Sequence, residues 1–167
     1  MTGAAHREAG PLSARIAWLT VSDTRRPEDD RSGSTGRGLV ERAGHTIADY
    51  RIVADEPERI RAVVSGWLAG IDCDAVLISG GTGVSPRDRT PEALAPLLER
   101  TLDGFGEIFR VLSFERVGSA ALLSRALAGV ARGKPLFALP GSPAAVELAL
   151  ERLILPELGH LLAELRK

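Results

Sequence analysis

The sequence has 167 residues, of which 44% are apolar and 26% are charged, with 21 basic against 22 acidic side chains. This length and composition predict one globular domain and exclude a disordered chain. The near-zero net charge and the lack of a basic arm argue against nucleic acid as a partner. The longest apolar runs fall far short of the roughly 20 residues that a membrane span needs, which argues against a membrane protein.

The N-terminal segment, Met1 to Pro11, is small and polar and lacks the apolar stretch of a secretory signal. We therefore expect a cytoplasmic protein with a flexible tail over residues 1–14 and a single folded domain over residues 15–167. Cys73 is the one cysteine, so an internal disulfide and a multi-cysteine metal site are both excluded.

The first half of the chain alternates strand and helix signals. Short apolar runs that end in polar turns indicate strands, and a capping residue or proline ahead of apolar residues at helical spacing indicates a helix. In chain order these signals predict a strand from Arg15 to Val21, a helix with the run 32–36 ahead of it as a capped start and Gly44 as its stop, a strand from His45 to Val53, a helix opened by Asp55 and Pro57, and a strand from Asp74 to Ser79. The alternation predicts a layered α/β fold with a parallel sheet.

The second half predicts mainly helices. In chain order we expect a helix opened by Thr90, a helix from Gly104 to Val117 that continues after a break at Gly118, a last strand from Lys134 to Leu139, and a terminal helix after Pro143 with a kink or restart at Pro156. The helix 104–117 should place Phe105, Ile108, Phe109 and Leu112 on one apolar face. The terminal helix is apolar on more than one face, so it is buried either in the domain or in a subunit contact.

Several predicted strand ends lead into polar or glycine-rich loops: Ser22 to Gly36, Gly80 to Thr90, and Pro140 to Pro143. In an open parallel sheet such loops lie at the carboxyl edge, where ligands bind. Glycine lets the backbone approach a ligand closely, and exposed backbone N–H groups bind anions. The loops therefore predict one pocket for a phosphate-bearing ligand. The segment Gly80 to Gly83 matches neither the P-loop nor the dinucleotide fingerprint, so a plain tight turn is the alternative interpretation of it.

Two aspartates, Asp55 and Asp88, each stand just before a predicted helix. Each is interpreted either as a helix cap or as a carboxylate that holds Mg²⁺ beside bound phosphates, and for Asp88 a pair with a neighbouring arginine is a further structural interpretation. The histidines have no metal-binding spacing, and no Gly-x-Ser-x-Gly elbow is present, so the sequence argues against a histidine metal site and covalent serine catalysis.

Taken together, the loop segments resemble the molybdenum cofactor biosynthesis family of MogA and MoaB type. The segments that carry the likeness are Thr20 to Arg25, Asp30 to Gly33, Gly80 to Gly83, Arg87 to Glu92 and Pro140 to Pro143. Of these, the spaced pair Gly-Gly-Thr-Gly and Asp-x-Thr-Pro is highly specific. Between them, Gly104 to Glu107 and Ser124 to Gly129 are more similar to the MoaB branch than to the Mog branch.

The resemblance implies a three-layer α/β/α molybdopterin-binding domain with a mostly parallel central sheet. It also implies an enzyme, a molybdopterin adenylyltransferase that uses Mg²⁺ and ATP, releases pyrophosphate and prepares molybdate insertion. Its members form trimers or hexamers, and the molybdate-inserting enzyme is a candidate partner. A MoaB-type protein that binds molybdopterin or serves as a scaffold without turning over ATP is the alternative, and a protein that shares only the fold is a second one.

By the same resemblance, Asp55 and Asp88 are the catalytic residues and the Mg²⁺ ligands. The residues expected to bind molybdopterin and nucleotide are Ser22, Asp23, Ser32, Gly33, Gly80, Gly81, Thr82, Gly83, Thr90, Gly141, Ser142 and Pro143. The resemblance thus favours the metal-binding interpretation of the two aspartates over the capping one.

Overall fold

The computed structural model describes residues 13–70 and 72–167. The strands are β1 (Arg15–Val21), β2 (Thr46–Val53), β3 (Ala75–Ser79), β4 (Arg100–Thr101), β5 (Leu127–Ala131) and β6 (Lys134–Leu139). The helices are α1 (Arg31–Arg42), α2 (Pro57–Ala69), α3 (Thr90–Leu94), α4 (Asp103–Val117), α5 (Pro143–Ala149) and α6 (Leu155–Leu165), with 3₁₀ segments η1 (Ala95–Leu97) and η2 (Gly118–Leu123) and a π-helical turn η3 (Leu150–Ile154). Most of the predicted tail, residues 1–12, lies outside the described residues.

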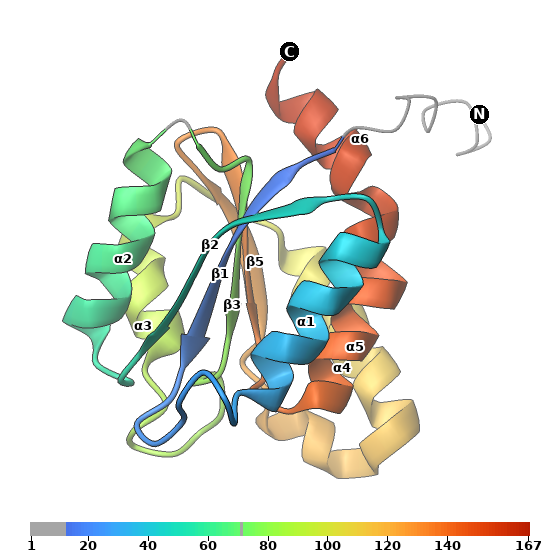
Figure 1. The fold of residues 1–167 in the computed structure, drawn as a ribbon. Helices are drawn as coiled ribbons and strands as arrows, with labels where there is room; N and C mark the ends of the chain where they lie inside the picture. The colour runs from blue at the N-terminus through green and yellow to red at the C-terminus, as the bar shows by residue number, and fades with distance from the viewer. Residues whose placement is uncertain (1–12, 71) are drawn as a thin grey trace.

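The strands form one six-stranded sheet in the order β2-β1-β3-β6-β5-β4 (Figure 1). Strands β2, β1, β3 and β6 pair in parallel, whereas β5 runs antiparallel to β6 and β4 antiparallel to β5. The mostly parallel sheet is as predicted. The sequence interpretation was wrong in passing over β4 and β5. A two-residue strand and the small-residue run Leu-Ala-Gly-Val-Ala carry too little local pattern: β5 becomes a strand by pairing with β6 across a tight turn at Arg132 and Gly133, and β4 only by pairing with β5.

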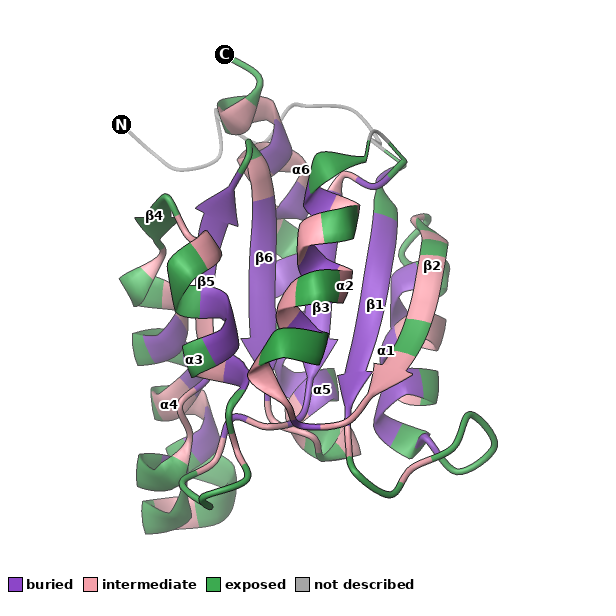
Figure 2. Ribbon diagram, turned by 90° about the vertical axis from the view of Figure 1, so that its left-hand side faces the viewer, coloured by how far each residue is buried: buried purple, intermediate pink, exposed green. Residues whose placement is uncertain are grey.

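Helices cover both faces of the sheet, which gives three layers (Figure 1). Residues alternate along each parallel strand between two separate apolar cores. In β1, for example, Ile16 and Trp18 point to the core beneath α1, α4, α5 and α6, whereas Ala17 and Leu19 point to the core beneath α2 and α3. The central strands β1, β3 and β6 are therefore buried apart from the first residues of β1 and β6 (Figure 2), which explains the continuous apolar run of β3.

The start of α1 differs from the prediction. The helix begins at Arg31, with Asp30 as the N-cap whose side chain accepts a hydrogen bond from the Gly33 amide. The small residues 32–36 therefore lie inside the first turns rather than ahead of them. The two glycines among them, Gly33 and Gly36, are required by packing: a Cβ on Gly36, for example, would lie only 1.9 Å from the Trp18 ring. A capping role for Asp55 was likewise wrong: α2 begins at Pro57, and its N-cap, Glu56, makes no side-chain cap bond.

The terminal helical segment is buried in the domain's own core. Val146, Leu150 and Ile154 belong to the same apolar cluster as Trp18, and Pro156 lies in the first turn of α6, directly after the π-helical turn. Of the two interpretations of the apolar terminal helix, burial in the domain or burial in a subunit contact, the structure therefore supports burial in the domain.

Helix α4 and η2 instead carry exposed apolar side chains. The predicted apolar face of α4 is only partly covered, because Ile108 is 51% exposed while Phe109 is buried. We call the exposed group the apolar stripe; its members are Ile108, Val111, Phe114, Val117, Leu122 and Leu123. None of the helices in the described residues combines the length and the apolar character that a membrane crossing needs.

Candidate functional site

The register of the sheet brings four loops to one edge. Thr20 lies opposite both Ile52 in β2 and Ser79 in β3, and Ser79 lies opposite Leu139 in β6. The parallel strands therefore end together. The first loop residues are joined across this edge, since the Ser22 amide donates to Val53 O (2.9 Å) and the Gly80 amide to Leu139 O (2.9 Å). As predicted, the glycine-rich loops meet where ligands bind in open parallel sheets.

The glycine turn after β3 is packed so closely that a side chain cannot fit. Gly80 and Gly81 both have positive φ values, of 101° and 68°. A Cβ on Gly80 would lie 2.2 Å from Val21 O, and a Cβ on Gly81 would lie 2.5 Å from Asp55 Oδ2 and 2.3 Å from Thr90 Oγ1. Thr90 is fully buried and holds the turn, with its hydroxyl donating to Gly80 O (2.8 Å) and its amide to Gly81 O (3.0 Å). The glycine turn is therefore fixed in place, and the Asp55 carboxylate packs directly against it.

Asp55 and Asp88 are held at neighbouring places along this turn. Asp55 is 6% exposed, and its Oδ1 accepts a hydrogen bond from the amide of Arg89, the residue after Asp88 (3.0 Å). Asp88 accepts from the Ser85 amide through Oδ2 (2.9 Å), so it closes its own loop rather than capping a helix. Burial, together with the charges of Asp88 and Asp23, raises the pKa of Asp55 above its ordinary value. A cation bound beside Asp55 would therefore stabilise the ionised form of its carboxylate, which burial and the neighbouring charges disfavour.

Asp23 connects the loop after β1 to this group. Its carboxylate accepts two hydrogen bonds from the Arg87 guanidinium (2.9 and 2.7 Å) and one from the Asp55 amide (3.0 Å). The hydrogen bond from Arg87 and that from the Asp55 amide lower the pKa of Asp23. In this arrangement Asp23 joins the loops after β1, β2 and β3, and its oxygens are already engaged by protein donors.

A second group of polar residues lies beneath the start of α1 and is centred on Asp30, which is 2% exposed. Its Oδ2 accepts from the hydroxyls of Thr20 (2.6 Å) and Tyr50 (2.7 Å), and its Oδ1 accepts from the Gly33 amide (3.0 Å) and Ser32 Oγ (3.2 Å). Burial alone would raise the pKa of Asp30, but these hydrogen bonds outweigh it and lower the pKa. Asp30 is therefore a buried carboxylate that fixes β1, β2 and α1 relative to one another.

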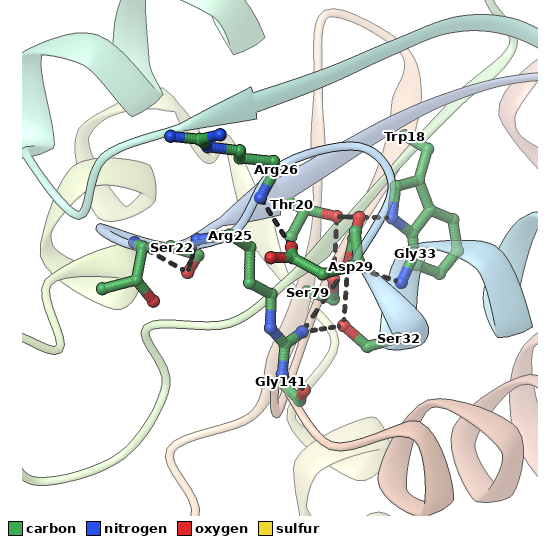
Figure 3. A network of polar contacts seen from close by, with 12 residues as sticks. Trp18, Thr20, Ser22, Arg25, Arg26, Asp29, Ser32, Gly33, Ser79 and Gly141 are labelled. Atoms are coloured by element: carbon green, nitrogen blue, oxygen red, sulfur yellow. Dashed lines mark hydrogen bonds and ion pairs between the residues drawn. The ribbon is translucent and has the colours of Figure 1, made fainter.

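Arg25 extends this buried network to the loop after β6. Its guanidinium donates to Ser32 Oγ (2.5 Å) and to Gly141 O (3.2 Å), and it lies 3.5 Å from Asp30 Oδ1. Figure 3 shows the side chain reaching from the β1 loop between Ser32 and Gly141. Ser22 stabilises the turn after β1, because its Oγ accepts hydrogen bonds from the amides of Thr24 and Arg25.

Some of the predicted site residues have polar groups that are already hydrogen-bonded within the protein. This group comprises Ser22, Asp23, Ser32 and Gly33. Thr82 is buried in the glycine turn and Gly141 packs beside Gly80, whereas Ser142 is exposed and caps α5, with Pro143 as its first residue.

Asp30 and Arg125 are among the site residues that were not predicted. Asp30 stands just before a helix, so the N-cap signal was there to find it. Arg125, which lies between η2 and β5, donates to Gly83 O (2.8 Å) and Asp88 O (2.7 Å). Its segment was noted for its likeness to the MoaB branch, but its contacts could not be predicted from it, since its partners are about forty residues away in the chain.

Comparison with known proteins adds to this geometry. A family model described as a probable molybdopterin binding domain matches residues 17–160, which include all six strands apart from the first two residues of β1, and therefore every strand end at this edge. The chain belongs to the molybdopterin-binding family of MoaB and MogA type. The family predicted from the loop segments is therefore confirmed.

Other members of this molybdopterin-binding family are similar along nearly their whole length. Molybdenum cofactor biosynthesis protein B of Halalkalibacterium halodurans is 48% identical over 163 residues, which cover 97% of this chain and 96% of that protein. A crystal structure of a molybdenum cofactor biosynthesis protein B superposes with a TM-score of 0.91 at 45% identity, covering 93% of this chain and 98% of that one. The tungsten cofactor synthesizing protein MoaB of Pyrococcus furiosus gives a TM-score of 0.84 at 34% identity, with 94% and 99% covered.

Proposed function

We propose that the protein acts in molybdenum cofactor biosynthesis by adenylylating molybdopterin. In this reaction the terminal phosphate of molybdopterin attacks the α-phosphorus of ATP, a new phosphoanhydride bond forms, and the bond to pyrophosphate breaks. The observation that carries the proposal is the placement of Asp55 and Asp88 against the glycine turn at the common strand edge. Family membership supports the pterin as the substrate.

The residues at this edge suit Mg²⁺ bound together with phosphates. In the described part of the chain, no three His, Cys, Asp or Glu side chains gather closely enough to hold a metal ion by themselves. Mg²⁺ is commonly bound through one or two carboxylates plus substrate phosphates and water, which is the set that Asp55, Asp88 and ATP would supply. The raised pKa of Asp55 fits this role, because a cation relieves the repulsion from the neighbouring carboxylates.

The chain's own contribution to the reaction is mainly positioning. Two anionic phosphates repel each other, so an adenylyl transfer needs them aligned in a place where their charge is neutralised. The loops that meet at the strand edge are joined to one another, through Arg87 to Asp23 and through Arg25 to Gly141, so they present one fixed surface. Mg²⁺, when bound, would screen the phosphate charge, and the exposed Arg89 adds a guanidinium beside it.

The proposal includes a homo-oligomer that acts in the cytoplasm, with the molybdate-inserting enzyme as a candidate partner. The apolar stripe on α4 and η2 supports the oligomer, because exposed apolar groups of this kind mark association surfaces. The terminal helix, whose apolar residues are buried in the domain, offers no comparable surface.

Pyrophosphate release from ATP in the presence of Mg²⁺ and molybdopterin tests the proposal. We expect release by the wild-type protein and none by Asp88→Asn, whose amide oxygen can still accept from Ser85. Asp72→Asn is the matched control, since the Asp72 side chain is 94% exposed and belongs to no loop of the site. It should keep wild-type activity.

The other outcomes separate the alternatives. Wild-type protein that binds molybdopterin but releases no pyrophosphate would be a binding or scaffold protein of the MoaB type. Protein that binds no pterin would share only the fold. An active Asp88→Asn variant would remove Asp88 from the catalytic machinery.

A further inference from the structure

The loop that carries Asp88 is held by a side chain from a distant segment. Arg125 donates through Nε to Gly83 O (2.8 Å), through Nη2 to Asp88 O (2.7 Å) and through Nη1 to Glu92 Oε1 (2.5 Å), and its own amide donates to Thr82 O (2.8 Å). The planar guanidinium thus engages a loop carbonyl on each of two sides and the α3 carboxylate on a third.

These contacts fall at the two ends of the same loop. Gly83 and Asp88 bracket a segment that is otherwise largely exposed, with Val84 62% exposed and Ser85 to Arg87 exposed as well. Inside the segment, Asp88 bonds only to Ser85, through side chain and amide. Among the described residues, an ion pair of Arg87 with Asp23 also joins the segment to the rest of the protein, and both of its side chains are more than one-third exposed.

We propose that Arg125 is a positioning residue, which holds the segment 83–88 so that the Asp88 carboxylate keeps its place against Gly83 and next to Asp55. The inference deepens the proposed function and rests on it, because it makes the Mg²⁺ requirement of the reaction depend on Arg125. Fixing both carbonyls fixes the chain direction on either side of Asp88. A lysine cannot do this, since its ammonium is a single point of contact rather than a fork.

Hydrogen exchange and Mg²⁺ titration together test the inference. Arg125→Lys and Arg125→Met are compared with wild type and with two controls, Glu92→Gln and Arg110→Met. Glu92→Gln removes the charge of the third partner but leaves both carbonyl bonds. Arg110 bonds to the carbonyl of Ala126, beside Arg125, without touching the loop.

In both Arg125 variants we expect faster amide exchange confined to residues 82–89 and a Mg²⁺ requirement for half-maximal pyrophosphate release raised about 10–100-fold, the usual cost of losing a residue that orients a ligand. The maximal rate should recover at saturating Mg²⁺. Both controls should match wild type in both measurements.

The exchange measurement needs no activity, so it separates the two hypotheses. Wild-type protein that releases no pyrophosphate would remove the proposed function and leave the positioning role to be decided by exchange alone. Unchanged exchange in residues 82–89 of Arg125→Lys would overturn the positioning role, as would a lower maximal rate at an unchanged Mg²⁺ requirement. Loss of protection throughout the sheet would also overturn it, because Arg125 would then support the whole fold rather than this loop.

Discussion

Alanine at position 81 would place a methyl group where the glycine turn meets Asp55 and Thr90. The φ of Gly81 is 68°, in the left-handed region, where an L-residue costs roughly 1–2 kcal/mol. The new Cβ would also lie 2.3 Å from Thr90 Oγ1 and 2.5 Å from Asp55 Oδ2, and relieving such overpacking in a fixed environment costs about 1–3 kcal/mol. We therefore expect Gly81→Ala to lower the free energy of unfolding by about 2–5 kcal/mol in total.

Gly133 offers a matched control for the backbone part of this cost. Its φ is 71°, almost the same as that of Gly81, but a Cβ placed there meets nothing within 4 Å. Gly133→Ala should therefore lose only the roughly 1–2 kcal/mol of the backbone strain. Urea unfolding of both variants at neutral pH measures the difference, which isolates the crowding at the site.

The same pair separates a functional effect from a structural one. In Gly81→Ala the side chains of Asp55 and Thr90 must move, so we expect it to lose pyrophosphate release under conditions in which it is fully folded, whereas Gly133→Ala keeps it. Equal losses of stability in the two variants would refute the reasoning, because the turn would then have room that the structure does not show. Full activity in a folded Gly81→Ala would refute the link between the turn and the aspartate.

Asp55→Asn keeps the acceptor for the Arg89 amide and removes a charge that burial disfavours. Because the pKa of Asp55 is raised in the folded protein, the stability that Asp55 contributes is present at low pH and is lost as the pH rises through that pKa. Calorimetry should therefore show a higher melting temperature for the variant than for wild type at pH 7, and a smaller difference in acid. A lower melting temperature for the variant at pH 7 would contradict this. Asp30→Ala has the opposite sign: it should lower the free energy of unfolding by about 3–5 kcal/mol at pH 7, because it breaks a buried charged network. Since the pKa of Asp30 is lowered in the folded protein, part of this loss disappears as the pH falls through the folded pKa. Urea unfolding over a series of decreasing pH values should show the difference in stability between the two proteins narrowing in acid, and a difference that stays constant would argue against an ionised buried carboxylate. The double variant Phe114→Asp and Leu122→Asp places charges on two members of the apolar stripe that are 62% and 83% exposed, so the molar mass measured by light scattering should fall as the oligomer dissociates. An unchanged molar mass would show that the apolar stripe does not take part in association.

Local patterns were enough for the parallel half of the fold. The apolar run from Ala75 to Ser79 predicted a strand covered on both faces, and β3 is buried along its whole length. Pro57 predicted the first turn of α2 correctly. Strand β5 escaped because its small residues become a strand only through pairing with β6. The exposure of Ile108 escaped for a related reason, since helical spacing defines an apolar face without saying what covers it.

The candidate site was predicted in the same uneven way. The glycine turn and the two aspartates were predictable because their spacing lies within short segments, and the order of strands and loops places them at one edge. The side-chain partners were not: Asp23 is engaged by Arg87, and Asp55 binds the amide of Arg89 rather than its own helix. Hydrogen bonds between loops depend on how the strands are aligned, which no single segment encodes.

By itself, then, the sequence determined the family, the alternation of strands and helices, and the loops that carry Asp55 and Asp88, because each of these is expressed in neighbouring residues. Only the tertiary structure decided that Asp30 is the centre of a buried network and that Arg125 holds the loop of Asp88. It alone also decided that the terminal helix is buried while α4 and η2 leave apolar side chains exposed. The physical reason is that burial and hydrogen-bond partners are properties of segments brought together by the sheet, whereas local sequence specifies only what each segment brings.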